Sequence, residues 1–295
     1  MRQNRDEKIR LYERRSLTGK VNTVFDFIHV NWRPWLRLSV YVLLPISIIA
    51  GMGLVDFMAH HVFHDHGGDW LASAIMVYGL MAVGYMMANC LCLSLMKCYF
   101  DRPDGLETVT FSDLWRCLRA VAWPMIVLSV LLFVVALPMS WLTMFAFLLM
   151  PFALLFYCAG VVNPLLMAAP VAVFEGCGVK EAIVRGFRLC YAQFWKMVGL
   201  MIVMLLIYFY SQLFFSGVWA LLSMILNAFV GGRIEITGDE VFLTAAYYVA
   251  TIAMTLVQYY AYSVLVMAIA LHYGSVAQEK DDADLETEID NFANL

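Results

Sequence analysis

The segment WLRLSVYVLLPISIIAGMGLVDF (Trp35–Phe57) carries charged side chains only near its two ends, at Arg37 and Asp56. Between these two residues lies an uncharged run that is rich in leucine, isoleucine and valine. A helix of about 20 apolar residues is long enough to cross the roughly 30 Å hydrocarbon core of a bilayer. The segment is therefore predicted to be a membrane-spanning helix.

Five further segments have the same apolar character: Trp70–Leu95, Val121–Pro138, Trp141–Phe174, Trp195–Phe215 and Val241–Leu271. The whole chain is 63% hydrophobic and 14% charged, with a mean hydropathy of +0.76. A soluble domain carries about 25% charged residues, so one globular core cannot hold this surplus of apolar surface. The sequence predicts an all-α integral membrane protein with six transmembrane helices.

Two parts of this pattern predict irregular helices. The fourth segment exceeds one perpendicular crossing, and Pro151 and the Asn163-Pro164 pair are expected to kink it. The stretch Ser216–Val230 is apolar but too short for another crossing. We expect it to hold the end of the fifth helix followed by a re-entrant or interfacial piece.

The basic residues predict the orientation of the chain. Eighteen of the 19 lysines and arginines lie at the termini or between spans two and three and spans four and five, and only Arg233 lies on the other side. This positive-inside asymmetry predicts a multi-pass protein of the plasma (inner) membrane with both termini in the cytoplasm. The predicted parts are a cytoplasmic N-terminal segment with an amphipathic helix (1–34), a six-span membrane domain (35–272) and an acidic cytoplasmic tail (273–295).

Each pair of spans follows an amphipathic segment that ends in tryptophan. Apolar residues at spacings of three and four predict a helix in each segment. The three faces are Leu17, Val21, Val24 and Ile28; Leu114, Cys117, Leu118 and Val121; and Val179, Ile183, Phe187, Cys190 and Phe194. Arginines opposite these faces and Trp32, Trp123 or Trp195 at the end are typical of helices in the headgroup layer. The chain is thus predicted to be a pseudo-threefold repeat of one interfacial helix and two spans.

The stretch PVAVFEGCGVKEAIVRGFRLCYAQFWKMVGLMIVMLL (Pro170–Leu206) resembles the signature of a bacterial six-span membrane protein family. This family includes the membrane domain attached to some glycerophosphodiester phosphodiesterases. Phe174-Glu175, Glu181-Ala182, Arg185 and Phe194-Trp195 carry the likeness. The resemblance implies the six-span fold and transfers no active site, because no segment here corresponds to the soluble catalytic domain of those enzymes.

Polar residues inside the predicted spans are amides and hydroxyls, including Asn89, Asn163, Thr251, Thr255 and Gln258. One interpretation is hydrogen bonding between helices, because an unpaired polar group in hydrocarbon is costly. The alternative is a polar pocket for a lipid headgroup or small solute, lined by the sixth span.

Glu175 ends a span just before a Gly-Cys-Gly turn. A structural carboxylate would pair with Arg185 or Arg188, or accept backbone N–H groups from the next helix. A general base is the other possibility, although no histidine, serine or metal cluster accompanies it on that side.

Four histidines gather in AHHVFHDHGGDW (Ala59–Trp70), in the first outer loop. His60 with His64, or His61 with His64, could chelate Zn²⁺ or Cu²⁺ on a helix, with Asp65 or Asp69 as a further ligand. The competing interpretation is a plain polar loop, because Gly67-Gly68 breaks a helix and no other outer segment supplies a histidine or cysteine.

These observations predict a protein that is not an enzyme, with no catalytic, cofactor-binding or metal site and no cofactor. The leading hypothesis is a scaffold or accessory membrane module that engages protein partners or lipid headgroups at its cytoplasmic face. The alternative hypothesis is a permease or lipid-handling transporter with a polar cavity between repeats. The lipid bilayer and a cytoplasmic or membrane protein are the expected partners. Nucleic acid is excluded, because the basic residues flank apolar spans and form no separate basic domain.

Overall fold

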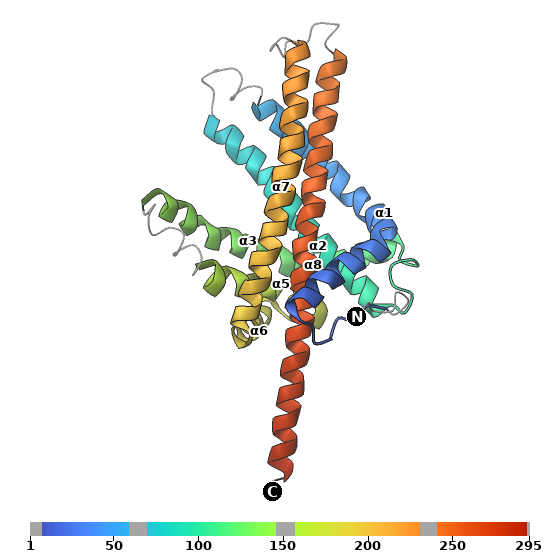
Figure 1. Ribbon diagram of the computed structural model, residues 1–295, viewed down its shortest axis with the longest axis vertical. Helices are drawn as coiled ribbons and strands as arrows, with labels where there is room; N and C mark the ends of the chain where they lie inside the picture. The colour runs from blue at the N-terminus through green and yellow to red at the C-terminus, as the bar shows by residue number, and fades with distance from the viewer. Residues whose placement is uncertain (1–7, 59–69, 146–156, 231–240, 294–295) are drawn as a thin grey trace. The chain divides into compact units, whose positions relative to one another are not determined.

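The structure, a computed structural model, describes residues 8–58, 70–145, 157–230 and 241–293, and every regular element within them is helical (Figure 1). In chain order these elements are α1 (Leu17–Met58), α2 (Trp70–Asp101), α3 (Phe111–Phe145), the π-helical turn η2 (Cys158–Val162), α5 (Asn163–Glu175), α6 (Val179–Ala192), α7 (Phe194–Val230) and α8 (Val241–Ala293).

Six helical stretches among the described residues are long and apolar enough to cross a membrane. They are Leu17–Met58, Trp70–Asp101, Phe111–Val135, Cys158–Glu175, Phe194–Leu221 and Ala245–Lys280. Each of the six apolar segments identified in the sequence overlaps one of them. The all-helical class and the six apolar helices are therefore confirmed.

Several helices are longer than the sequence predicted. α1 and α3 each join a predicted interfacial segment to the following span in one helix. α7 continues unbroken to Val230, so the expectation of a re-entrant piece after Ser216 is wrong. An unbroken helix pairs the backbone groups of this apolar stretch internally, which a re-entrant turn would not do. α8 likewise passes through the predicted boundary at residues 272–273.

The Asn163-Pro164 pair coincides with a real irregularity, because the chain makes a π-helical turn just before it. The Asn163 N–H reaches back five residues to the Cys158 carbonyl. Pro164 has no N–H to donate to the Gly160 carbonyl, which instead accepts a 2.7 Å hydrogen bond from the Tyr191 hydroxyl of α6. The other predicted kink, at Pro151, lies outside the described residues.

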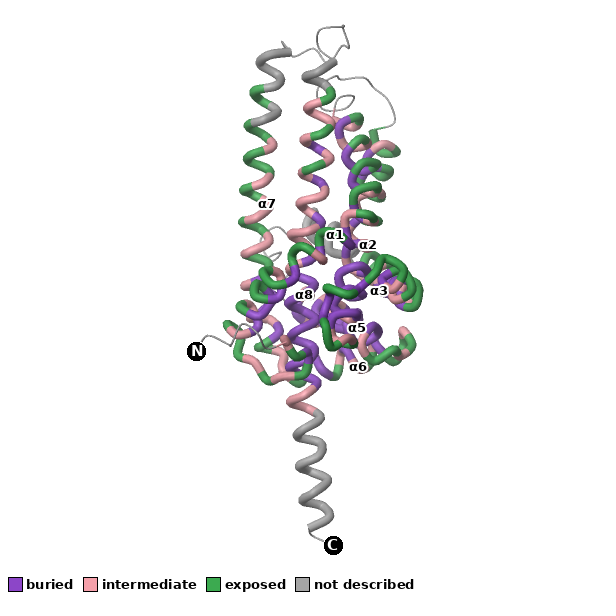
Figure 2. Tube along the Cα trace, turned by 90° about the vertical axis from the view of Figure 1, so that its right-hand side faces the viewer, coloured by how far each residue is buried: buried purple, intermediate pink, exposed green. Residues whose placement is uncertain are grey.

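The chain divides into two compact units. The first holds Met1–Leu36, Cys90–Met204 and Leu265–Leu295, and α5 lies at its centre. In Figure 2, α5 is almost entirely coloured as buried, and 61% of the apolar stretch Cys158–Glu175, which includes η2, is buried. The left-handed backbone of Gly176 (φ 67°) ends α5, and α6 follows after a short turn.

The second unit holds Arg37–Asn89 and Leu205–Val264. Glycines permit close helix packing there: a Cβ atom at Gly51 would lie 2.9 Å from the Ile252 Cα atom. A Cβ atom at Gly84 would overlap the Tyr259 ring. The Ser39 and Tyr260 hydroxyls, 2.9 Å apart, add a polar link between α1 and α8. Small residues at helix contacts are typical of membrane bundles.

The predicted amphipathic faces are buried to different degrees. At the start of α3, Leu114, Leu118 and Val121 are buried, whereas Arg116 and Arg119 are exposed. The buried residues of α6 are Ala182, Gly186, Leu189 and Cys190, so only Cys190 of the predicted face is fully buried. In the first segment Val24 is buried but Leu17 is 38% exposed. The pseudo-threefold repeat stays a prediction.

Candidate functional site

Residues 8–16 form a segment without regular secondary structure, here called the strap, that packs against α8 and the end of α2 in the first unit. Leu11 is buried against Gly274, where any Cβ atom would overlap the Leu11 carbonyl oxygen. The Arg15 N–H donates a 3.2 Å hydrogen bond to Ser275 Oγ. The strap can lie directly on the α8 backbone because residue 274 is glycine and has no side chain.

Two lysines cap the ends of helices. Lys8 Nζ donates to the Phe100 carbonyl at 3.2 Å and also to the Arg102 carbonyl, at the end of α2. Lys97 Nζ donates to the Val173 carbonyl at 2.6 Å, near the end of α5. The last carbonyls of a helix lack internal donors and carry partial negative charge, so a cation stabilises them.

Glu175 joins three helices at one oxygen atom. Its Oε1 accepts a 2.7 Å hydrogen bond from the Tyr273 hydroxyl of α8 and lies 2.7 Å from Arg185 Nε of α6. The Tyr12 hydroxyl of the strap lies 3.4 Å from that of Tyr273. Of the alternatives predicted for Glu175, the pairing with Arg185 is the one present, and this carboxylate connects parts of the first unit.

The sequence did not single out a second polar contact, between Lys20 of α1 and His272 of α8. Lys20 Nζ lies 2.7 Å from His272 Nδ1, and the two residues are 2% and 0% exposed. His272 Nε2 is buried without a hydrogen-bond partner among the described residues. The sequence did carry an indication that Lys20 is buried, because the helical spacing of Lys20, Thr23 and Asn31 places them on one side of α1. The structure shows that all three are buried.

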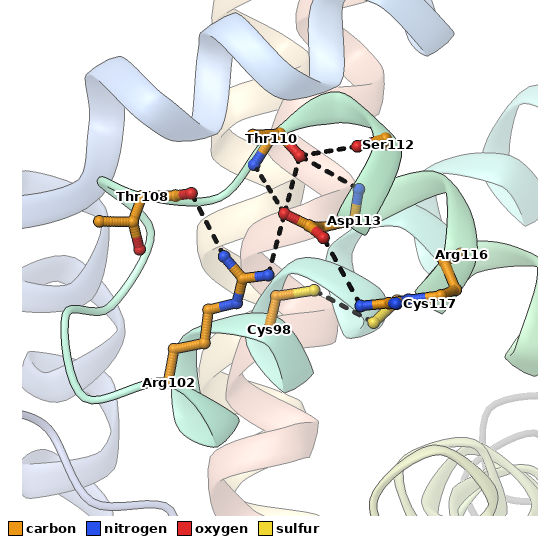
Figure 3. A network of polar contacts seen from close by, with 8 residues as sticks. All are labelled: Cys98, Arg102, Thr108, Thr110, Ser112, Asp113, Arg116 and Cys117. Carbon is orange, nitrogen blue, oxygen red and sulfur yellow. Dashed lines mark hydrogen bonds and ion pairs between the residues drawn. The ribbon is translucent and has the colours of Figure 1, made fainter.

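The turn between α2 and α3 is held by a polar network (Figure 3). Arg102 Nη2 lies 2.9 Å from Asp113 Oδ2, which also accepts from the Thr110 hydroxyl at 2.7 Å. The Asp113 N–H in turn points to Thr110 Oγ1 at 3.4 Å. Thr110 and Asp113 thus form a reciprocal cap at the start of α3. Arg116 Nη2 lies 3.5 Å from the other carboxylate oxygen.

The strap and the ends of α2 and α5 border a pocket of about 400 Å³ that is open to the surface. It is lined by Lys8, Ile9, Arg10, Leu11, Tyr12, Phe100, Asp101 and Phe174. The volume is within the range of small-ligand pockets, about 300–1,000 Å³. Its lining combines cationic, anionic and aromatic residues.

Arginine and tryptophan form two exposed pairs in the first unit. The Arg33 guanidinium lies 5.2 Å from the Trp32 ring, and the Arg119 guanidinium lies 5.2 Å from the Trp115 ring. Trp32 and Trp115 are 47% and 42% exposed. Two more tryptophans of this unit are highly exposed, Trp123 at 72% and Trp195 at 81%. We use the name basic–aromatic surface for these four tryptophans with Arg33 and Arg119, which belong to α1, α3 and α7.

Cys177 lies in the turn between α5 and α6, outside the apolar helices, and is partly exposed. Burial raises the pKa of its thiol, and the negative charges of Glu175 and Glu181 raise it further. This thiol is therefore a weaker nucleophile near neutral pH than an ordinary exposed cysteine.

Two of the polar residues expected to line a pocket on the sixth span, Thr251 and Thr255, make hydrogen bonds between and within helices. Thr251 Oγ1 accepts a 3.1 Å hydrogen bond from Trp219 Nε1 and donates to the Tyr247 carbonyl. Thr255 Oγ1 donates to the Thr251 carbonyl. Both threonines are buried, which fits the interpretation of these residues as packing elements.

The histidine cluster lies outside the described residues, and so does the segment between α7 and α8 that holds Arg233. The residues concerned are His60, His61, His64, His66, Asp65, Asp69, Arg233, Glu235, Asp239 and Glu240. Within the described part of the chain, no three histidine, cysteine or acidic side chains are close enough to hold a metal ion.

No protein-family model, curated protein or solved structure matches the chain. The resemblance of Pro170–Leu206 to the membrane domain of glycerophosphodiester phosphodiesterases therefore stays a prediction that none of these comparisons supports.

Proposed function

We propose that the chain is a non-enzymatic membrane module, a scaffold or accessory subunit, whose first unit binds anionic lipid headgroups at the cytoplasmic face of the plasma membrane. The basic–aromatic surface is the observation that carries this proposal. Tryptophan favours the headgroup layer, because its ring is apolar and its N–H is polar. A guanidinium next to that ring can pair with a lipid phosphate in a bidentate geometry.

The magnitude of the electrostatic effect supports this proposal. A lysine or arginine near an anionic membrane surface contributes about 1 kcal/mol of binding free energy. Arg33 and Arg119 lie on different helices, α1 and α3, so a headgroup layer would contact the unit at two places. The exposed Arg188 and Lys180 of α6 would add to the attraction.

The ionic groups at the helix ends support a role without catalysis. Glu175 is already bound by Tyr273 and Arg185, and Lys8 and Lys97 already cap helix ends. These contacts give each group a structural role that explains its presence. The proposed orientation, with both termini in the cytoplasm, rests on the asymmetry of lysine and arginine along six apolar helices.

Thermal stability in nanodiscs of defined composition tests the proposal. We expect the melting temperature to be at least about 3 °C higher with 30% phosphatidylglycerol in phosphatidylcholine than with phosphatidylcholine alone, because a ligand that binds the folded state stabilises it. The variant Arg33→Gln with Arg119→Gln should lose most of this difference, and Arg33→Lys with Arg119→Lys should keep part of it. Equal melting temperatures in the two lipids for the wild-type protein would refute the proposal.

A further inference from the structure

Two thiols lie next to each other where α2 ends and α3 begins. The Sγ atoms of Cys98 and Cys117 are 3.2 Å apart. Figure 3 draws this pair beside the network of Arg102 and Asp113. Cys98 is 4% exposed and Cys117 is partly exposed. All seven cysteines of the chain are free thiols in this structure.

The turn between the two helices keeps this pair together. Arg102 follows Cys98 by one helical turn and is bound to Asp113, which lies one turn before Cys117. Arg102 Nη1 also donates a 3.2 Å hydrogen bond to the Thr108 carbonyl within the turn. Each cysteine therefore lies one turn from a residue of the same ion pair, so the ion pair keeps the two thiols close.

We propose that Cys98 and Cys117 form a redox modification site, in which a peroxide converts the two thiols into an intramolecular disulfide. A disulfide bond is about 2.05 Å long, so the two sulfur atoms must approach by roughly 1.2 Å. Side-chain rotation at the ends of two helices can supply such a movement. This site is independent of the proposed headgroup binding, because none of its residues belongs to the basic–aromatic surface.

The reaction starts at Cys117, because it is the more accessible of the two thiols. Its thiolate attacks one oxygen of hydrogen peroxide, which breaks the O–O bond and leaves a sulfenic acid and, after protonation, one water molecule. The Cys98 sulfur then displaces the hydroxyl from the Cys117 sulfur. That hydroxyl leaves as a second water molecule with the Cys98 proton. In sum two thiols and one peroxide give one disulfide and two waters, and a dithiol reductant reverses the change by exchange.

The location favours a reversible modification over a permanent crosslink. The pair lies on the side of the chain that the basic residues assign to the cytoplasm, where disulfides are transient and serve redox sensing. The bond would fasten α2 to α3 through two residues 19 positions apart, next to the cap at Thr110 and Asp113. Oxidation would therefore stabilise this corner of the first unit.

Peptide mapping of the full-length protein in nanodiscs tests the proposal without any substitution. The reduced protein is treated with one to five equivalents of hydrogen peroxide, the remaining thiols are blocked with N-ethylmaleimide, and the digest is analysed by mass spectrometry. We expect a Cys98–Cys117 crosslinked peptide that disappears after treatment with a dithiol. Peroxide that oxidises Cys117 to sulfinic acid with no crosslinked peptide, or that yields only crosslinks between chains, would overturn the proposal.

Single substitutions then assign the steps. After blocking, reduction and labelling with polyethylene-glycol maleimide, the oxidised wild-type protein should carry two labels and Cys117→Ser none. Cys98→Ser should retain a sulfenic acid at Cys117 that dimedone traps. Cys177→Ser removes another partly exposed thiol and should still give two labels. Two labels on Cys117→Ser would contradict the assignment.

Discussion

The Tyr273 hydroxyl donates a 2.7 Å hydrogen bond to Glu175 Oε1, and this contact joins the last apolar helix to the end of α5. The same oxygen lies 2.7 Å from Arg185 Nε. Since Tyr273 is fully buried, its hydroxyl depends on protein partners for hydrogen bonding. Glu175 is thus a structural carboxylate that connects α5, α6 and α8.

Substitution of Tyr273 tests this connection. Tyr273→Phe should lower the free energy of unfolding by about 1–3 kcal/mol, because a hydrogen bond to a charged group is lost. Tyr210→Phe is a matched control, since Tyr210 is 67% exposed, and it should change stability little. The measurement is the melting temperature of both variants in the same lipid. Equal stability of Tyr273→Phe and the wild-type protein would show that the contact contributes nothing.

The strap should detach when Gly274 is replaced. In Gly274→Ala the new methyl group overlaps the Leu11 carbonyl oxygen, and overpacking of this kind costs about 1–3 kcal/mol. We expect limited trypsin digestion to cleave after Arg10, Arg14 or Arg15 faster than in the wild-type protein.

Gly79→Ala is the control for this experiment, because a Cβ atom at Gly79 meets no other atom within 4 Å. It should leave the cleavage rate of the strap unchanged. Unchanged cleavage in Gly274→Ala would mean that the strap does not depend on the close approach to α8.

Lys97 should stabilise α5 through its cap on the Val173 carbonyl. Lys97→Met keeps the aliphatic stem and removes the ammonium group, so we expect a loss of about 1–2 kcal/mol from the unpaired carbonyl. Lys180→Met changes the charge equally at an exposed position of α6 and should be close to neutral. Denaturation of the three proteins in one detergent would compare them. A larger loss for Lys180→Met would contradict the capping role.

The Cys177 thiol should react slowly with maleimide at pH 7 and faster as the pH rises beyond the usual range of a cysteine pKa. Burial and the charges of Glu175 and Glu181 raise the pKa of this thiol, so the reactive thiolate forms only at higher pH. Glu181→Gln should speed the labelling at neutral pH, because it removes one negative charge. A labelling rate that levels off by pH 8 would disprove this prediction.

The same thiol reports the orientation of the chain. An impermeant maleimide should label Cys177 in inside-out vesicles and spare it in sealed right-side-out vesicles, if the turn between α5 and α6 faces the cytoplasm. The opposite pattern would reverse the proposed topology.

The features that could be predicted from the sequence are those that depend on local composition and spacing. Apolar runs identified all six candidate spans, and the spacing of Leu114, Leu118 and Val121 identified a face that is buried. An ion pair of Glu175 with Arg185 or Arg188 could be predicted because these residues follow Glu175 across one short turn, and the structure shows the pair with Arg185.

What the sequence could not predict depends on contacts between distant residues. Lys20 contacts His272, which lies 252 positions further along the chain, and no local sequence pattern around either residue predicts this contact. The strap was missed because a segment without regular secondary structure has no helical period, and its packing depends on one glycine of α8. The sequence analysis ended the fifth span at Phe215 because a bilayer crossing needs only about 20 residues. The helix continues to Val230, and no proline interrupts Ser216–Val230.

Lipid selectivity at the protein surface tests the central claim most directly. Spin-labelled phosphatidylglycerol and phosphatidylcholine are compared by electron paramagnetic resonance for the wild-type protein and for Arg33→Gln with Arg119→Gln. We predict that the wild-type protein prefers phosphatidylglycerol at least about threefold, because each exposed cation near the headgroups favours an anionic lipid, and that the double variant loses most of this preference. Equal association of both lipids with the wild-type protein, or an unchanged preference in the variant, would contradict the proposed function of the basic–aromatic surface.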